Sequence, residues 1–211
     1  MSNPNPHELS SDEELLYRLR RGQREVFAVL VRRYERELYG YLRRYLGDPH
    51  LADDVFQNTF LQVYVKSDQF EEGRPVRPWL YTIATHQAID AMRKTGRRSA
   101  VSLDQNAGET AEGEVRSLGE LLESAGAGPD ELTEREERRR RLRDCVDRLP
   151  EFLRQVVLLA YFQGLKYREI AEILGIPVGT VKSRLHTALL KLQEAGGAAG
   201  GPADVPALQD R

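Results

Sequence analysis

The sequence predicts an all-α fold made of two small helical domains that are joined by a flexible acidic linker. Apolar residues recur at the three- and four-residue spacing of helices on both sides of the chain, and no alternating, strand-like run competes with them. Residues 167–185 have the pattern of two short helices connected by a tight turn. Between the two helical regions lies a glycine-containing acidic segment that lacks apolar periodicity.

The composition of the 211-residue chain excludes several classes of protein. No apolar run approaches the length of a membrane span, and the acidic start is unlike a signal peptide, so we expect a cytoplasmic protein without membrane insertion. The single cysteine, Cys145, excludes an internal disulfide and a Cys-based zinc cluster, and the four histidines lack metal-ligand spacing. No nucleophile–base pair or phosphate-binding glycine loop is present. We therefore expect no cofactor, no metal and no enzymatic activity.

The net charge of −2 hides an uneven distribution of charge. Residues 1–98 contain 16 basic and 14 acidic residues, and residues 134–194 contain 13 basic and 9 acidic ones. The predicted linker, residues 99–133, contains one basic residue against eight acidic ones. The two helical domains are therefore basic, as a nucleic-acid partner requires. A flexible linker of 35 residues spans roughly 30–35 Å, about one turn of B-DNA.

Four helices are predicted in residues 1–98. Ser11 and Glu14 form a capping box that opens a helix over residues 12–21, which Gly22 ends. A long amphipathic helix follows over residues 26–45, and it ends at the Gly-Asp-Pro sequence of residues 47–49. The third helix spans residues 51–63. The fourth spans residues 79–92 and runs into the cations Arg93, Lys94, Arg97 and Arg98.

The second domain, residues 134–194, begins with a charged helix over residues 134–148 and continues with an apolar one that ends near Gly164. In the following helix pair, Gly175 ends the first helix, Pro177 prevents it from continuing, and Thr180 caps the second. Residues 195–211 form a low-complexity tail.

The second helix of this pair has a polar face near its start. Its apolar stripe leaves Lys182, Ser183, Arg184 and His186 pointing away from the core. A helix-turn-helix presents such residues to the DNA major groove, so we predict DNA contacts for these four and for Thr180. The alternative is a helical hairpin with solvated basic residues.

The fourth helix of the first domain combines aromatic, polar and basic residues. Aromatic rings beside amides and cations suit unstacked bases, and arginines at the end of the helix suit phosphates. The alternatives are that Trp79 belongs to the core and that the arginines are solvated. The predicted nucleic-acid contacts are Trp79, Tyr81, Thr82, His86, Gln87, Arg93, Arg97 and Arg98.

The order of the motifs resembles that of extracytoplasmic-function (ECF) sigma factors, the two-domain promoter-recognition subunits of bacterial RNA polymerase. The resemblance rests on residues 53–60 (DDVFQNTF), residues 77–84 (RPWLYTIA), the linker and the helix-turn-helix, and it extends from about Asp12 to Glu194. It implies a sigma region 2-like domain followed by a region 4-like domain.

The resemblance also implies the partners of each surface. One stretch would dock on the clamp helices of the core polymerase through Asp53, Asp54, Gln57, Asn58 and Phe60. The fourth helix and the loop before it would recognise and melt the −10 element and capture a flipped base. The helix-turn-helix would bind the −35 element, the linker would run toward the RNA exit path, and an anti-sigma factor would hold the protein inactive.

Five residues depart from the common family pattern. Asn58 stands in place of an acid, His86 in place of Asn, and Lys166 in place of the Ser or Thr that caps the first helix of the helix-turn-helix. On the second helix of that pair, Thr187 and Leu189 stand in place of frequent arginines. Two other functions remain open: an autonomous helix-turn-helix regulator with a sensing N-terminal domain, and a protein-binding adaptor. The docking-like motif around Gln57 favours the sigma factor, because a plain regulator has no need of it.

Overall fold

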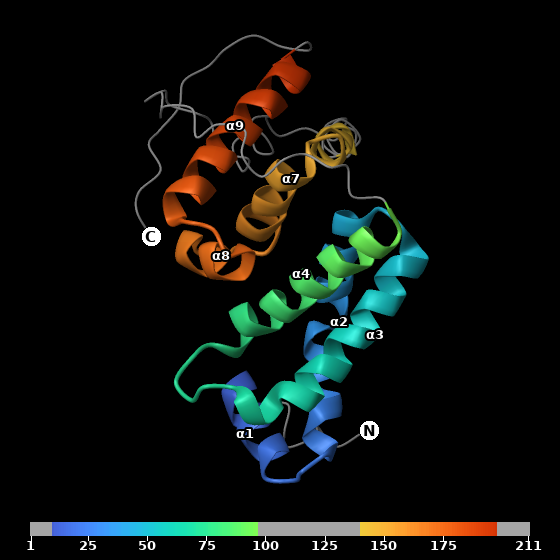
Figure 1. The fold of residues 1–211 in the computed structure, drawn as a ribbon, viewed down its shortest axis with the longest axis vertical. Coiled ribbons are helices and arrows are strands. Elements are labelled where there is room, and N and C mark those ends of the chain that lie inside the picture. Colours follow the sequence, from blue (N-terminus) through green and yellow to red (C-terminus); the bar gives the residue numbers. More distant parts are fainter. Residues whose placement is uncertain (1–9, 97–139, 198–211) are drawn as a thin grey trace, which may run out of the picture. The chain divides into compact units, whose positions relative to one another are not determined.

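The computed structural model describes residues 10–96 and 140–197, whose helices form two compact units (Figure 1). The first unit contains α1 (Asp12–Arg20), α2 (Glu25–Leu46), α3 (Pro49–Lys66), a short 3₁₀ helix η1 (Ser67–Gln69) and α4 (Val76–Lys94). The second contains a helix over residues 140–147, α7 (Glu151–Val157), a π-helical turn η2 (Leu158–Phe162), α8 (Tyr167–Leu174) and α9 (Val178–Gly197). No strand occurs in these ranges, so the all-α prediction is confirmed.

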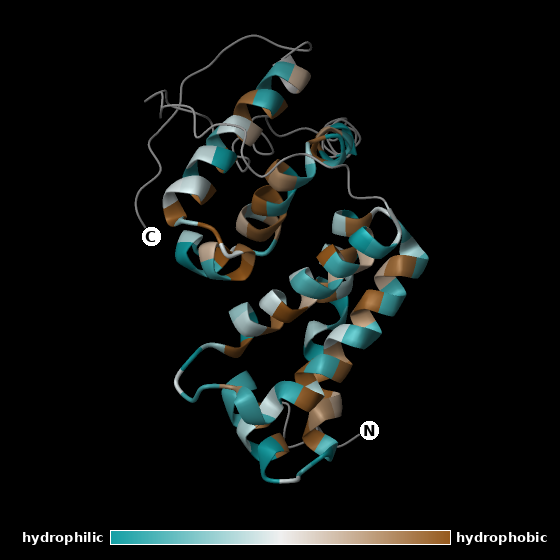
Figure 2. Cartoon of the chain, viewed as in Figure 1, coloured by the Kyte–Doolittle hydropathy of each residue, from teal (hydrophilic) through white to brown (hydrophobic). Residues whose placement is uncertain are grey.

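Polar and apolar residues alternate along the helices of both units (Figure 2). This pattern lets each helix bury one side and expose the other. Within the two described ranges, no helix combines the length and the apolar character that crossing a membrane would require. Arg97, Arg98 and the predicted linker lie outside the described residues, as does the first part of the charged helix predicted over residues 134–148.

The ends of the first helices follow from local chemistry. The Ser11 hydroxyl accepts a hydrogen bond from the Glu14 amide at 3.2 Å, as predicted, but the Glu14 carboxylate pairs with Arg18 of the same helix at 2.6 Å. Gly47 adopts the left-handed conformation, with φ of 68°, and ends α2. The Asp48 side chain then caps α3 by accepting hydrogen bonds from the amides of its first turn.

Tyrosines dominate the centre of the first unit. Tyr41, Tyr45 and Tyr81 are completely buried. The Tyr41 ring stacks on Tyr45 with a centroid distance of 5.9 Å and meets the Tyr81 ring edge-on at 5.3 Å. The Tyr41 and Thr85 hydroxyls share a buried hydrogen bond of 2.8 Å. Ring packing and this bond fix α4 against α2.

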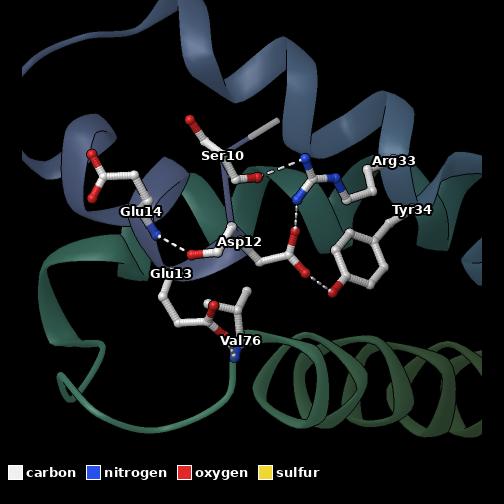
Figure 3. Close-up of polar contacts among 8 residues, drawn as sticks. Ser10, Asp12, Glu13, Glu14, Arg33, Tyr34 and Val76 are labelled. Carbon is white, nitrogen blue, oxygen red and sulfur yellow. Dashed lines mark hydrogen bonds and ion pairs between the residues drawn. The ribbon is translucent and has the colours of Figure 1, made fainter. Parts of the chain in front are cut away.

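A group of polar contacts holds α1 against the rest of the first unit (Figure 3). The Asp12 carboxylate accepts hydrogen bonds from the Arg33 guanidinium and the Tyr34 hydroxyl, both on α2. Arg33 also donates to the Ser10 carbonyl at 2.8 Å. Burial and the Asp12 contact raise the pKa of Tyr34, so its hydroxyl stays protonated and remains a donor.

In the second unit, α7 packs against α9. Gly175, with φ of 64°, ends α8 as predicted, and the Ile176 amide closes the turn by donating to the Ala171 carbonyl at 3.1 Å. The apolar faces of these elements are buried. The buried residues include Leu153, Val156, Ile170, Ile173, Val181, Leu185 and Leu189. The predicted helix-turn-helix is therefore present in the structure.

The predicted cap of the last helix is wrong. Because α9 begins at Val178, Thr180 lies inside its first turn and is not the cap. The Pro177 carbonyl already accepts the amides of Thr180 and Val181, at 2.9 and 3.1 Å, so the helical pattern starts before Thr180. At its other end, α9 continues to Gly197, past the predicted start of the tail at Ala195; residues 198–211 lie outside the described ranges.

The start of α8 retains a cap despite Lys166. The Glu169 carboxylate accepts a hydrogen bond from the Lys166 amide at 2.7 Å. This contact is the reciprocal half of a capping box, in which an acid three residues into the helix bonds back to the residue before it. The expected loss of a Ser or Thr side chain is thus partly offset by Glu169.

The buried Tyr41–Thr85 bond predicts a specific pattern of stability. Thr85→Val keeps the shape of the side chain but leaves the Tyr41 hydroxyl buried without a partner, so we expect a loss of about 1–3 kcal/mol in the free energy of unfolding. The double variant Tyr41→Phe/Thr85→Val removes both polar groups and should recover most of that loss. Urea titration of the three proteins measures the effect. A Thr85→Val protein as stable as the wild type would contradict the assignment of this bond.

Candidate nucleic-acid interface

Four of the predicted nucleic-acid contacts lie on one face of α4. Positions 79, 82, 86 and 93 are separated by three, four and seven residues, which places them in line along a helix. His86 and Arg93 are exposed, whereas Trp79 and Thr82 are half-buried. Gln87 is half-buried beside this line. We call Trp79, Thr82, His86 and Arg93 the α4 face.

Trp79 belongs to both the core and the surface. Its ring meets the Phe70 ring at a centroid distance of 5.0 Å and an angle of 60°, while the side chain remains half-exposed. Trp79 can therefore pack in the core and still present part of its ring to a nucleic acid. Phe70 lies at the start of the loop before α4, so the ring contact fixes Trp79 against that loop.

Tyr81 does not lie on the α4 face, contrary to the prediction. It is 0% exposed, and its hydroxyl donates to Glu37 of α2 at 3.4 Å. The Arg77 guanidinium lies 5.2 Å from the ring centroid and also pairs with Glu37, at 3.2 Å. Burial, followed by the charge of Glu37, raises the pKa of Tyr81. Two residues beyond Trp79 the helix surface has turned toward the core, so Tyr81 anchors α4 against α2 and is not exposed for contact in this structure.

The predicted docking motif on α3 likewise contains both exposed and buried residues. Asp53, Asp54, Gln57 and Asn58 are all exposed on α3. Phe60 is only 5% exposed, and its ring packs edge-on against Phe27 and Phe56 with centroid distances of 6.1 and 5.0 Å. The prediction that Phe60 contacts a partner is therefore not compatible with its position in the core.

Three exposed apolar residues on α3 were missed by sequence reasoning. Leu61, Tyr64 and Val65 are 62%, 38% and 68% exposed. They follow Asp54 and Asn58 at helical spacing and continue the same exposed side. An available signal was the density of apolar residues in the second half of α3, because one buried face cannot accommodate all of them. We call Asp53, Asp54, Gln57, Asn58, Leu61, Tyr64 and Val65 the α3 face.

At the start of α9, Lys182 is the most exposed of the five predicted contacts, and the other four are half-buried. The Ser183 hydroxyl donates to the Thr180 carbonyl at 3.1 Å. The Arg184 guanidinium lies 5.6 Å from the centroid of the Phe152 ring on α7, and burial lowers the pKa of Arg184. The Nε2 atom of His186 is buried without a hydrogen-bond partner among the described residues. Lys182 is therefore the residue best placed to reach a ligand.

The described residues of the two units contain no cluster suited to a metal ion. Within residues 10–96 and 140–197, no group of three or more histidine, cysteine or carboxylate side chains is arranged to hold one. The exposed faces of α3, α4 and α9 instead present rings, hydroxyls, cations and carboxylates, which are groups that bind nucleic acids and proteins.

Comparison with known proteins identifies both units. Residues 30–98 match the family model of sigma-70 region 2, and residues 139–192 match that of sigma-70 region 4. The first match includes α3 and α4, and the second includes α7, α8 and most of α9. The region 2-like and region 4-like interpretation is thereby confirmed.

Individual relatives and solved structures that match most of the chain agree with the two family models. The ECF RNA polymerase sigma factor SigW of Bacillus subtilis is 34% identical over 168 residues, which cover 80% of this chain and 87% of SigW. The structure of CnrH in complex with the cytosolic domain of CnrY has a TM-score of 0.61 and 22% identity, with 90% of this chain and 99% of that one covered. The sigma factor RpoE of Bartonella quintana, solved with the anti-sigma factor NepR, has a TM-score of 0.58 and 22% identity, with coverage of 82% and 98%. The chain belongs to the family of ECF RNA polymerase sigma factors.

Proposed function

We propose that this chain joins core RNA polymerase and directs it to a specific set of promoters. The observation that carries the proposal is the α4 face, on which an aromatic ring, a hydroxyl, an imidazole and a guanidinium lie in line on a helix fixed by its opposite side. The protein contributes recognition and DNA opening, and bond formation belongs to the polymerase. This activity places it in the cytoplasm, with the polymerase and its template.

The α4 face suits the −10 element once its bases are unstacked. The half-exposed Trp79 ring offers a stacking surface, which is worth about 1–3 kcal/mol for each base. His86 and Thr82 supply hydrogen-bonding groups in the middle of the face, and the exposed Arg93 supplies a phosphate contact near its end. Rings hold unpaired bases while cations hold the backbone, so this arrangement favours melted over duplex DNA.

The α3 face suits the clamp helices of the polymerase. Its carboxylates lie toward the start of the helix, and its exposed apolar residues lie toward the end. Exposed apolar side chains next to polar groups are typical of protein–protein contact surfaces. The Asn58 departure removes one negative charge from this surface, and the exposed Leu61 and Val65 supply apolar area that can compensate for it.

The start of α9 suits the major groove of the −35 element. Lys182 is exposed in the second turn of the recognition helix, where base edges and phosphates are within reach. Arg184 and His186 lie deeper, against the protein. We propose that Lys182 contributes most of the direct contact and that Arg184 mainly supports the helix.

We further propose an anti-sigma factor as the partner that restrains this protein. The Bartonella quintana relative was solved in such a complex. The exposed apolar residues of the α3 face give an inhibitor a surface on which it would block polymerase docking.

Run-off transcription tests the proposed function. Purified protein is added to bacterial core polymerase with a library of genomic fragments, and the transcripts are sequenced. We expect discrete start sites that share a two-part motif and are absent with core polymerase alone. Tight, sequence-selective DNA binding by the isolated chain, unchanged by polymerase, would instead identify an autonomous regulator.

Reversing one charge on the α3 face should weaken polymerase docking. For Asp54→Arg we expect the affinity for core polymerase to fall by about tenfold, or 1.4 kcal/mol, because the substitution places a cation where the partner faces a carboxylate. Asp68→Arg is the matched control, since Asp68 is exposed on η1, outside the α3 face. Fluorescence titration against core polymerase gives both affinities. Equal affinities for the two variants would remove Asp54 from the interface.

Two substitutions on α9 should distinguish a residue that contacts DNA from one that supports the helix. Lys182→Ala should weaken binding to a −35 element by about 1–3 kcal/mol if it contacts a base, and it should change the melting temperature less than Arg184→Ala does. Arg184→Ala should lower the stability of the second unit by about 0.5–1 kcal/mol, because it loses the contact with the Phe152 ring. Transcription from the cognate promoter and thermal unfolding measure the two effects. Unchanged transcription with Lys182→Ala would show that the contact face is placed incorrectly.

A further inference from the structure

We infer that Glu13, on α1, is a positioning residue that fixes the start of the base-reading helix α4. This role rests on the function proposed for the α4 face. It concerns a residue outside the segment matched by the region 2 family model, which begins at residue 30.

The start of α4 has no cap of its own. Its N-cap residue is Pro75, which has no side-chain hydrogen bond to offer, and its first turn contains no acid. The unpaired amides at the start of a helix need acceptors, and the positive end of the helix dipole favours a negative charge. The two acids of the loop that leads into α4 pair with arginines instead, Glu71 with Arg74 and Glu72 with Arg20.

Glu13 supplies both from a distant part of the chain. Its carboxylate accepts a hydrogen bond of 3.1 Å from the amide of Val76, the first residue of α4, across 63 residues of sequence. Desolvation by burial raises the pKa of Glu13, but the hydrogen bonds it accepts, first that from Val76, outweigh this effect and lower the pKa below its ordinary value. The carboxylate is therefore charged at neutral pH. The stabilisation that its charge adds is lost only as the pH falls through this lowered pKa, whereas an oxygen acceptor for the Val76 amide remains.

The end of α1 that carries Glu13 is held in place by its neighbours (Figure 3). Asp12, the residue before it, is bound by Arg33 and Tyr34 of α2, and Ser11 caps the same turn. Glu13 thus projects from an anchored helix end toward Val76 and connects α2 to the start of α4.

The loop that leads into α4 lies beside α1. A cleft of about 280 Å³ lies between α1 and the loop, lined in part by Glu13, Tyr17, Phe70 and Gly73. Arg20 of α1 also pairs with Glu72 of the loop at 3.2 Å, and such exposed ion pairs contribute little. Packing of the buried Phe70 and Val76 holds the two ends of the loop. The Glu13–Val76 bond adds the charged acceptor that the first amide of α4 otherwise lacks.

The Glu13–Val76 bond also determines where Trp79 lies. Trp79 is three residues after Val76 and packs on Phe70, where the loop begins. One end of the loop is closed by this ring contact and the other by the Glu13 cap. Release of the cap would let the first turn of α4 fray and would change the direction in which the Trp79 ring faces.

The free protein gives a direct test, because Trp79 is the only tryptophan of the chain. Glu13→Ala should increase acrylamide quenching of its fluorescence and speed hydrogen exchange of the Val76 amide by roughly 2- to 30-fold, as expected when a side-chain cap is lost. Glu13→Gln keeps an oxygen acceptor and should stay close to the wild type. Glu14→Ala is the matched control, because the Glu14 carboxylate pairs with Arg18 of the same helix and not with α4 among the described residues.

The complete holoenzyme tests the consequence for promoter recognition. We compare transcription from a promoter found by the run-off experiment, as a duplex and with the −10 region pre-melted, and with each base of the −10 element replaced. Glu13→Ala should lower duplex transcription by about tenfold and flatten the base preference, while affinity for core polymerase stays within about twofold. Glu13→Gln should restore both properties.

The possible outcomes separate the two proposals. Wild-type fluorescence, exchange and base preference in Glu13→Ala would overturn the positioning role and leave the sigma function standing. A parallel loss of core affinity would also overturn it, because the effect would then be a general loss of structure. Failure of the wild-type protein to direct any transcription would instead refute the proposed function, whereas the fluorescence and exchange results would still decide whether Glu13 positions α4.

Discussion

The burial of one side of α4 is the constraint on which the first unit depends. Tyr81, Ala84, Thr85 and Ala88 are all buried, and Tyr81 and Thr85 contact Tyr41 of α2 directly. Rotating α4 to present other residues would expose these groups and break the Tyr41–Thr85 bond. The residues on the opposite side are consequently fixed in their outward direction before any ligand arrives. This preorganisation matters for recognition, because a side chain that is already placed loses less entropy on binding.

On α3 and α9, too, buried residues fix the helix while exposed residues remain available for contact. Phe60 on α3 and Leu185 on α9 belong to the cores of their units, while Asp54 and Lys182 stay at the surface. Each unit has its own buried apolar residues and so can hold its contact face without the other. The charge pattern of the sequence agrees with this organisation, because the acidic residues concentrate between two basic helical regions. A sigma factor must engage two promoter elements and a polymerase at once, and independent units on one chain serve that need.

Helical periodicity and helix-ending residues were sufficient to predict the elements. The stripe of α2, the glycines at positions 47 and 175 and the turn of the helix-turn-helix were all visible, because they depend on neighbours within a few residues. Predictions failed where distant contacts decide. Tyr81 and Phe60 stand beside exposed residues in the sequence, and only the packing of α2 against α3 and α4 shows that they are buried. The bond from Val76 to Glu13 joins residues 63 positions apart and has no local sequence signature.

The central claim is that the exposed faces of α3, α4 and α9 are the surfaces that meet polymerase and promoter. Hydroxyl-radical footprinting with mass spectrometry, on the free chain and on its complex with core polymerase and a cognate promoter, measures this residue by residue. The account predicts that core polymerase protects Leu61 and Tyr64, that promoter DNA further protects Trp79, His86 and Lys182, and that buried Tyr41 stays unchanged. Strong protection elsewhere, with these residues as reactive in the complex as in the free chain, would contradict it.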